Sequence, residues 1–299
     1  MPGWMNSTEM SRQSFLRLTS AWVAGAWVPY YAAARGFGGE AATNRFALCS
    51  DTHIAEDPKE TYRGFFPAAN LQAVIQDICD YPFDMAFING DAARLDGKQE
   101  DYLHLQKLLQ PLAKHCPITI GLGNHDDRDV FRKVFSPVYA DEVKGANKHV
   151  TIVDTAHGRW LVLDSLMYVN KAAGQLGKAQ RLWMAEYLKK STDKPLWILV
   201  HHTLGDNDGE LMDSGPLLSL VKAAPHVKAI FYGHSHQYHV KQDGGLYLVN
   251  IPAIGYNFSD KEPVGWIECE TMAGGMRLKL HAMAGDQSKN GETHTLKWN

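Results

Sequence analysis

The chain has 299 residues, long enough for one large domain or two small ones, and its composition of 45% hydrophobic and 21% charged residues excludes a disordered or fibrous protein. The formal net charge is −3 and no run of Lys or Arg forms a basic stripe, so long nucleic acid is not an expected partner. The four cysteines are scattered singly, which argues against a thiolate zinc site and against a disulfide framework.

Residues 1–42 differ from the rest of the chain and have the layout of an export signal. A basic segment, 11–17, precedes an apolar stretch, 18–31, and small residues follow. The segment 11–17 resembles a twin-arginine signal, except that Gln13 stands in place of the second arginine. The apolar stretch is short for a membrane span, which needs about 20 residues, so the mature domain is expected to lack a transmembrane segment. We expect a periplasmic protein, and the alternative is a cytoplasmic protein with a flexible N-terminal segment.

From residue 43 onward, short apolar runs alternate with segments of helical periodicity, which is the pattern of an α/β domain. The expected strands are 46–50, 85–89, 118–120, 150–153, 160–164, 196–200, 229–232, 247–251, 265–269 and 276–280. The expected helices are 70–80, 100–114, 178–190 and 216–223. The late strands follow one another with few helices, which indicates a second, more antiparallel sheet. We expect the domain to span 43–284 and residues 285–299 to form a loose polar tail.

Short polar motifs lie at the ends of five expected strands. They are Asp51-Thr52-His53, Gly90-Asp91, Gly123-Asn124-His125-Asp126, His201-His202 and Gly233-His234-Ser235-His236. Open α/β sheets build their sites from the loops at the carboxyl ends of their strands, so these motifs are expected to meet. In the first and last motifs, one residue separates two candidate ligands. We expect an extended backbone there, with alternate side chains facing one pocket.

The side chains of these motifs are typical of a metal site. Carboxylate oxygens, imidazole nitrogens and one amide oxygen, without sulfur, suit Mn, Fe, Zn or Co. A single ion would not need so many ligands, whereas two ions about 3.5–4 Å apart, bridged by one carboxylate, would. Each motif alone is common in structural positions, but all five in order on strand ends favour a dinuclear metal site.

At these motifs the sequence resembles the calcineurin-like metallophosphoesterase superfamily, over roughly residues 45–280. The run 123–128, Gly-Asn-His-Asp-Asp-Arg, is especially similar to class III cyclic-nucleotide phosphodiesterases and the related glycerophosphodiesterases. The resemblance implies a four-layer αββα sandwich, with two β-sheets packed face to face and helices outside. It also implies hydrolysis of a phosphoester, with a phosphodiester favoured, at two divalent or trivalent metal ions.

The resemblance assigns a role to each motif residue. The implied metal ligands are Asp51, His53 and His236 at the first metal and Asn124, His201 and His234 at the second. Asp91 would bridge the two metals, and a hydroxide held between them would attack phosphorus. His125 would face the scissile phosphate as a general acid or phosphate contact. Asp126 would orient His125 by accepting its other ring N–H.

Three further residues are expected to contact the substrate, namely Arg63, Arg128 and His202. Arg63 belongs to an aromatic segment, 62–66, that is expected to form a lid or to pack on the core. Arg94 stands three residues after the bridging aspartate, where purple acid phosphatases of this superfamily carry a metal-binding tyrosine. An iron-tyrosinate site is therefore not expected.

The sequence leaves other functions open. A phosphomonoesterase and a nucleotide-directed nuclease of the same superfamily are alternatives to the phosphodiesterase. A metal-free binding scaffold is a third alternative, which the complete set of ligands disfavours. The expected partner is a small phosphoester, and the sequence predicts neither the metal, the substrate nor the oligomeric state.

Overall fold

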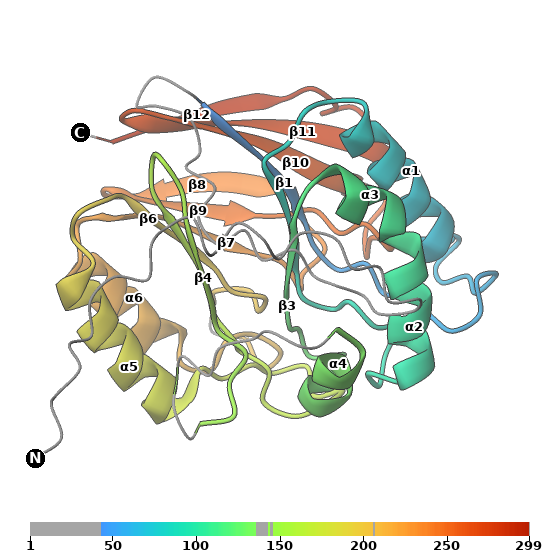
Figure 1. Ribbon diagram of the computed structural model, residues 1–299, viewed down its shortest axis with the longest axis horizontal. Helices are drawn as coiled ribbons and strands as arrows, with labels where there is room; N and C mark the ends of the chain where they lie inside the picture. The colour runs from blue at the N-terminus through green and yellow to red at the C-terminus, as the bar shows by residue number, and fades with distance from the viewer. Residues whose placement is uncertain (1–42, 136–142, 144–145, 206, 299) are drawn as a thin grey trace, which may run out of the picture.

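The fold was analysed in a computed structural model, which describes residues 43–135, 143, 146–205 and 207–298. Two six-stranded sheets pack face to face, and helices cover the outer sides (Figure 1). This arrangement confirms the predicted αββα sandwich. The expected export signal at 1–42 lies outside the described residues and stays a prediction. Among the helices that the structure describes, none is long and apolar enough to cross a membrane.

The first sheet has the strand order β12-β11-β10-β1-β2-β3. Its strands are β1 (Asn44–Cys49), β2 (Met85–Asn89), β3 (Ile118–Gly121), β10 (Pro263–Met272), β11 (Gly275–Gly285) and β12 (Thr293–Lys297). β1, β2 and β3 run parallel, and the other three strands add antiparallel on the β1 side. The helices nearest this sheet are α1 (Pro67–Cys79), α2 (Gln99–Leu108), α3 (Gln110–His115) and α4 (Arg128–Phe135). Figure 1 shows α1, α2 and α3 together along one outer side of the sandwich.

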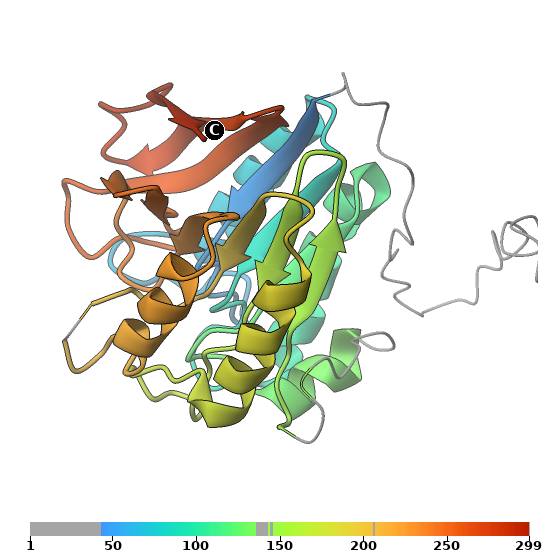
Figure 2. The same ribbon diagram turned by 90° about the vertical axis from the view of Figure 1, so that its left-hand side faces the viewer.

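The second sheet has the order β4-β5-β6-β7-β9-β8. Its strands are β4 (Thr151–Asp154), β5 (Arg159–Val162), β6 (Leu196–Leu199), β7 (Val227–Tyr232), β8 (His239–Asp243) and β9 (Leu246–Asn250). The four middle strands, β5, β6, β7 and β9, run parallel, and the edge strands β4 and β8 are antiparallel to their neighbours. The helices α5 (Gly177–Lys190) and α6 (Ser214–Lys222) cover its outer face (Figure 2).

Large aromatic side chains fill the space between the two sheets. Trp160 of β5 lies with its ring centroid 5.4 Å from Phe46 of β1 and 4.9 Å from Phe87 of β2. Trp197 and Phe231, from the second sheet, pack against the same Trp160 ring. All five side chains are buried. Because both faces of these strands are covered, their sequences are nearly continuous apolar runs, and the aromatic contacts fix the two sheets relative to each other.

The structure differs from the predicted elements at four places. The expected helix 100–114 is two helices that meet at Leu109, because Pro111 has no N–H to continue the first one. Helix α4 was not predicted, and β8 was missed because it is a mostly polar edge strand. The prediction of a loose tail at 285–299 is wrong. Residues 293–297 form β12, which pairs with β11 and buries Leu296 between the sheets.

We predict that Leu296→Ala lowers the free energy of unfolding by roughly 3 kcal/mol, because it leaves a cavity in the core between the sheets. Thr295→Ala, on the exposed face of the same strand, is the matched control and should change stability by less than about 0.5 kcal/mol. Urea unfolding of both variants measures the difference. Equal stability of the two variants would show that β12 adds nothing to the core.

Candidate metal centre

The five motifs converge at one end of the sandwich, where the parallel strands of both sheets finish. Asp51, Asp91 and Asn124 follow β1, β2 and β3, and His201 and His234 follow β6 and β7. Backbone hydrogen bonds tie neighbouring motifs together: the amides of Asp51 and His53 donate to the carbonyls of Gly90 and Asp91 at 3.1 and 2.9 Å. The site is therefore built jointly by the two sheets.

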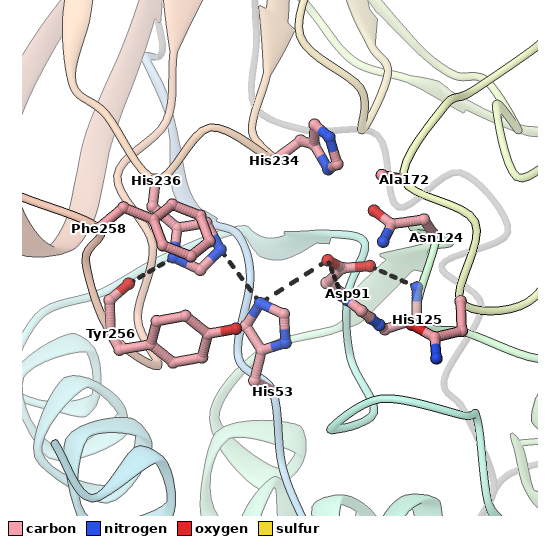
Figure 3. A pocket seen from close by; sticks show the side chains of 10 residues that line it. His53, Asp91, Asn124, His125, Ala172, His234, His236, Tyr256 and Phe258 are labelled. Carbon is pink, nitrogen blue, oxygen red and sulfur yellow. Dashed lines mark hydrogen bonds and ion pairs between the residues drawn. The ribbon is translucent and has the colours of Figure 1, made fainter. Parts of the chain in front are cut away.

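The potential ligand atoms form three close groups among the described residues. Two of them combine residues expected at the first and at the second metal, and the third joins His53 and Asp91 to His125. In each of the groups Asp51–His53–His236 and Asp91–His201–His234, one ligand atom per residue lies within 4.8 Å of the others. Asn124 lines the same pocket (Figure 3). The structure thus brings together all seven predicted metal ligands.

Asp91 belongs to the group with His201 and His234 and also reaches the group with Asp51, His53 and His236. Its Oδ2 is 3.7 Å from Nε2 of His53 and 3.4 Å from Nε2 of His201, which belong to different groups. Asp51 Oδ1 is 3.3 Å from Nε2 of His236. A carboxylate within reach of both groups has the position that a bridging ligand requires.

Three buried polar atoms of the site have no hydrogen-bond partner among the described residues. They are Asp51 Oδ1, Asn124 Oδ1 and His201 Nε2. A buried polar atom without a partner is costly, and such atoms are rare in native proteins. All three belong to predicted ligands, and oxygen and imidazole nitrogen are the donors that the expected metals prefer. The residues therefore fit a pair of metal ions.

The remaining ring nitrogen of each ligand histidine faces a backbone carbonyl, which fixes the orientation of the ring. The pairs are His53 Nδ1 with Arg94 O (3.3 Å), His201 Nδ1 with Asn89 O (2.8 Å), His234 Nε2 with Gly209 O (2.8 Å) and His236 Nδ1 with Tyr256 O (2.6 Å). A nitrogen that donates to a carbonyl carries the proton, so the other nitrogen of the ring is left as an acceptor. In its neutral form, each imidazole thus presents a lone pair to the site.

The ligand motifs are tight turns and not the extended segments that the sequence predicted. Five ligands have a left-handed backbone, with φ of 53° at Asp51, 47° at His53, 47° at Asp91, 68° at His234 and 53° at His236. This conformation costs a non-glycine residue about 1–2 kcal/mol. The turns direct Asp51 and His53 to the first group and His234 and His236 to different groups, so the local strain is a consequence of assembling the site.

Gly123 is required because two ligands approach its backbone closely. A Cβ at this position would overlap the Asp91 carboxylate and would lie 2.7 Å from Nε2 of His201. Any side chain here would displace both groups. Gly123 therefore serves close approach. Gly90 serves both the turn, with φ of 86°, and close approach, because a Cβ there would lie 2.6 Å from Nδ1 of His201.

The electrostatics of the site favour a bound cation. Burial would raise the pKa of Asp91, but the imidazoles of His201 and His53 hold it well below its usual value. Burial also lowers the pKa of His53 to about 3, so this ligand is neutral at physiological pH. Burial opposes the charged form of His201, yet Asp91 and Asp51 outweigh it and raise the pKa to about 10. Without metal, a proton on His201 would balance the buried carboxylates, and a metal ion would displace it.

His125 faces the pocket, but Asp126 does not orient it. His125 Nε2 is 4.0 Å from Asp91 Oδ2, and its Nδ1 lies 2.9 Å from the carbonyl of Leu95, which holds the ring (Figure 3). The expected hydrogen bond to Asp126 is wrong. The buried Asp126 carboxylate instead accepts from the amides of Ala92, Ala93 and Gly123 and from the hydroxyl of Tyr102. It ties the loop after β2 to the loop after β3.

The three expected substrate contacts lie elsewhere. Arg128 forms a two-pronged ion pair with the buried Asp164, at 2.6 and 2.9 Å. Arg63 donates to the carbonyls of Asn257 and Phe258, both at 3.0 Å. His202 is buried, with Nδ1 2.7 Å from the hydroxyl of Ser165. Each of the three side chains is engaged with the protein and none lines the described pocket, so the three substrate contacts stay predictions.

The pocket over the predicted ligands, of about 270 Å³, is also lined by residues that the motifs did not reveal. They are Asn170 and Ala172 from the loop after β5, and Tyr256 and Phe258 from the loop after β9. The only sequence signal for the second loop is Gly255. Its backbone lies close to the carbonyls of Thr52 and Asp51, and a Cβ at this position would lie about 3 Å from both. A single sequence does not distinguish such a glycine from an ordinary turn.

We predict that Asp126→Asn lowers the free energy of unfolding by on the order of 3 kcal/mol. The side-chain NH2 of asparagine would face backbone N–H groups that now donate to the Asp126 carboxylate, so hydrogen bonds would be lost. Asp129→Asn, on the exposed start of α4, is the matched control. Thermal or urea unfolding measures the effect. A variant with full stability and a selective loss of turnover would restore the orienting role toward His125.

Comparisons with known proteins agree with the geometry of the candidate metal site. The family described as calcineurin-like phosphoesterase matches residues 44–238. The 3',5'-cyclic adenosine monophosphate phosphodiesterase CpdA of Haemophilus influenzae is 27% identical over 242 residues, which cover 78% of this chain and 84% of CpdA. The glycerophosphodiester phosphodiesterase GpdQ of Enterobacter lignolyticus is 28% identical over 231 residues, which cover 73% of this chain and 81% of GpdQ.

Solved structures share the fold at low sequence identity. A dimetal phosphatase from Danio rerio superposes with a TM-score of 0.66 at 14% identity, covering 86% of this chain and 99% of that one. The purple acid phosphatase PPD1 from yellow lupin has the same TM-score at 17% identity, covering 88% of this chain and 55% of the lupin chain. Identities this low carry the architecture and not the substrate.

Proposed function

The chain belongs to the calcineurin-like phosphoesterase family, and we propose that it is a dinuclear-metal-dependent phosphodiesterase acting on a small phosphoester. The observation that carries this proposal is that Asp91 reaches the side chains of both ligand groups, and that three buried oxygen and nitrogen atoms of the site have no hydrogen-bond partner among the described residues. Such a site has no evident purpose in a metal-free scaffold, because unpaired buried carboxylate and amide oxygens are costly.

The chain would hold one metal with Asp51, His53 and His236 and the other with Asn124, His201 and His234. When bound, two such ions supply a water of lowered pKa and neutralise charge on the phosphoryl oxygens. The backbone carbonyls behind the imidazoles keep the ligand nitrogens aimed at the site.

His125 has the geometry of a general acid. The Leu95 carbonyl accepts from Nδ1, so the ring is held with Nε2 toward the pocket in its neutral and protonated forms alike. In the protonated form, Nε2 donates its proton to the departing oxygen of the ester. The ring is partly exposed at the pocket, so it can exchange its proton with water between turnovers.

The charge of the pocket supports a diester over a monoester. Within the described part of the chain, no Lys or Arg lines the pocket, and Arg63 and Arg128 are held by other partners. A monoester brings a second negative charge, which phosphate sites usually meet with Arg or Lys. A diester carries one negative charge, and the relatives CpdA and GpdQ are both named as phosphodiesterases.

We predict that metal-free protein supplied with Mn, Zn, Fe or Co hydrolyses bis(p-nitrophenyl) phosphate with a kcat/KM at least about tenfold above that for p-nitrophenyl phosphate. A monoester carries a second negative charge, and no Lys or Arg lines the described pocket to balance it. Release of p-nitrophenol measures both rates, and chelator-treated protein without added metal is the control. A preference for the monoester would contradict the diester assignment, and metal-independent turnover would contradict the mechanism.

We predict that His125→Ala keeps two metal ions per chain and lowers kcat by about 10²–10⁴-fold, the usual contribution of a general acid. Asp91→Ala is the contrasting variant and should lose both metal binding and activity. Elemental analysis and diester turnover of the two proteins separate the roles. Loss of a metal ion from His125→Ala would mean that His125 is a ligand, since it also lies within reach of His53 and Asp91.

A further inference from the structure

We propose that the hydroxyl of Tyr256 is a further catalytic group, which donates a hydrogen bond to a phosphoryl oxygen on the first-metal side of the pocket. The proposal rests on the proposed phosphoesterase function and goes beyond it, because the motifs of the sequence do not include Tyr256. It also identifies the loop after β9 as a functional part of the site.

The ring of Tyr256 is fixed by the first-metal ligands. Its centroid lies 4.7 Å from that of His53 and 4.6 Å from that of His236. Its backbone carbonyl accepts from Nδ1 of His236 at 2.6 Å, so one residue orients a ligand and borders the pocket. Tyr62 packs edge-on against the ring at 4.6 Å, and the guanidinium of Arg94 lies over Tyr62 at 4.5 Å. These contacts fix the direction in which the Tyr256 side chain points.

That direction is into the pocket. In Figure 3 the ring of Tyr256 lies across the pocket, with its hydroxyl beside His53 on the side toward Asp91. Among the described residues the hydroxyl has no hydrogen-bond partner, although the side chain is almost fully buried and lines the pocket. The contrast is Tyr102, whose buried hydroxyl donates to Asp126 and accepts from the amide of Asp127. The Tyr256 hydroxyl is thus a free donor beside the first group of ligands.

A phosphoryl oxygen is the partner that fits this donor. A phenol has an ordinary pKa of about 10 and is protonated at neutral pH, so it donates without adding charge. The pocket offers no Lys or Arg within the described residues, so a fixed neutral donor is suited to a monoanionic diester. Donors aimed at oxygens that gain charge in the transition state contribute most to rate, because they need no reorganisation.

The test compares Tyr256→Phe with Tyr62→Phe. The first variant removes only the pocket hydroxyl, and the second removes a hydroxyl from the adjoining ring, which does not line the pocket. We expect Tyr256→Phe to lower kcat/KM for bis(p-nitrophenyl) phosphate by roughly 10- to 100-fold, the loss of one hydrogen bond to a charged acceptor. Tyr62→Phe should stay within about twofold of the wild type. Both variants should bind two metal ions per chain.

A second measurement does not depend on turnover. Titration calorimetry of metal-loaded protein with inorganic phosphate should show a Kd about tenfold higher for Tyr256→Phe and unchanged for Tyr62→Phe. Equal kcat/KM and equal phosphate affinity in Tyr256→Phe and the wild type would overturn the proposal. Loss of one metal ion from Tyr256→Phe would also overturn it, because the tyrosine would then be a ligand. If the wild type hydrolyses no ester, the proposed function fails, and the phosphate titration alone decides the role of Tyr256.

Discussion

The structure of the site depends on one buried carboxylate that both sheets reach. Asp91 Oδ1 accepts from the amide of His125 at 2.9 Å, and Oδ2 faces His53 from the first sheet and His201 from the second. A buried charge of this kind is tolerated only when cations or strong donors surround it. Two backbone features follow from placing ligands around the Asp91 carboxylate. Residue 123 is a glycine, because a side chain there would overlap the carboxylate, and Asp91 itself has a left-handed backbone.

The aromatic interior makes that arrangement possible. Ligands from two sheets meet within a few ångströms only if the sheets keep a fixed relative position. Trp160 contacts Phe46 and Phe87 across the interface, and close-packed rings of this size resist small displacements. The cost of strained turns and buried charges at one end of the sandwich is thus offset by apolar burial along its length.

Strand periodicity predicted an α/β domain with a second sheet, and the strand-end motifs predicted the convergence of the ligands, because both are local signals. The sandwich itself was implied by the family resemblance that the motifs carry. The sequence did not predict what depends on distant contacts. The family resemblance assigned Asp126 to orient His125, but the amides of the loops after β2 and β3 surround its carboxylate instead. Arg128 suggested a phosphate contact, yet a buried Asp164 36 residues later holds it. Tyr256 carries no motif, since only the path of the loop after β9 brings its ring to His53.

These differences change the chemical character of the pocket. The sequence suggested a site in which arginines meet the phosphate, whereas the described pocket combines imidazoles, two amides and one carboxylate with two aromatic rings. Phe258 stacks on His236 at 4.3 Å, and the Arg63 guanidinium lies over Phe258 at 5.6 Å, so that arginine supports the pocket wall and does not enter it. Under the proposed function, discrimination between phosphoesters would rest on the number of charges that bound metals neutralise. A pocket lined by neutral donors and no Lys or Arg among the described residues would favour an ester with a single negative charge, which is the physical basis of the proposed diester preference.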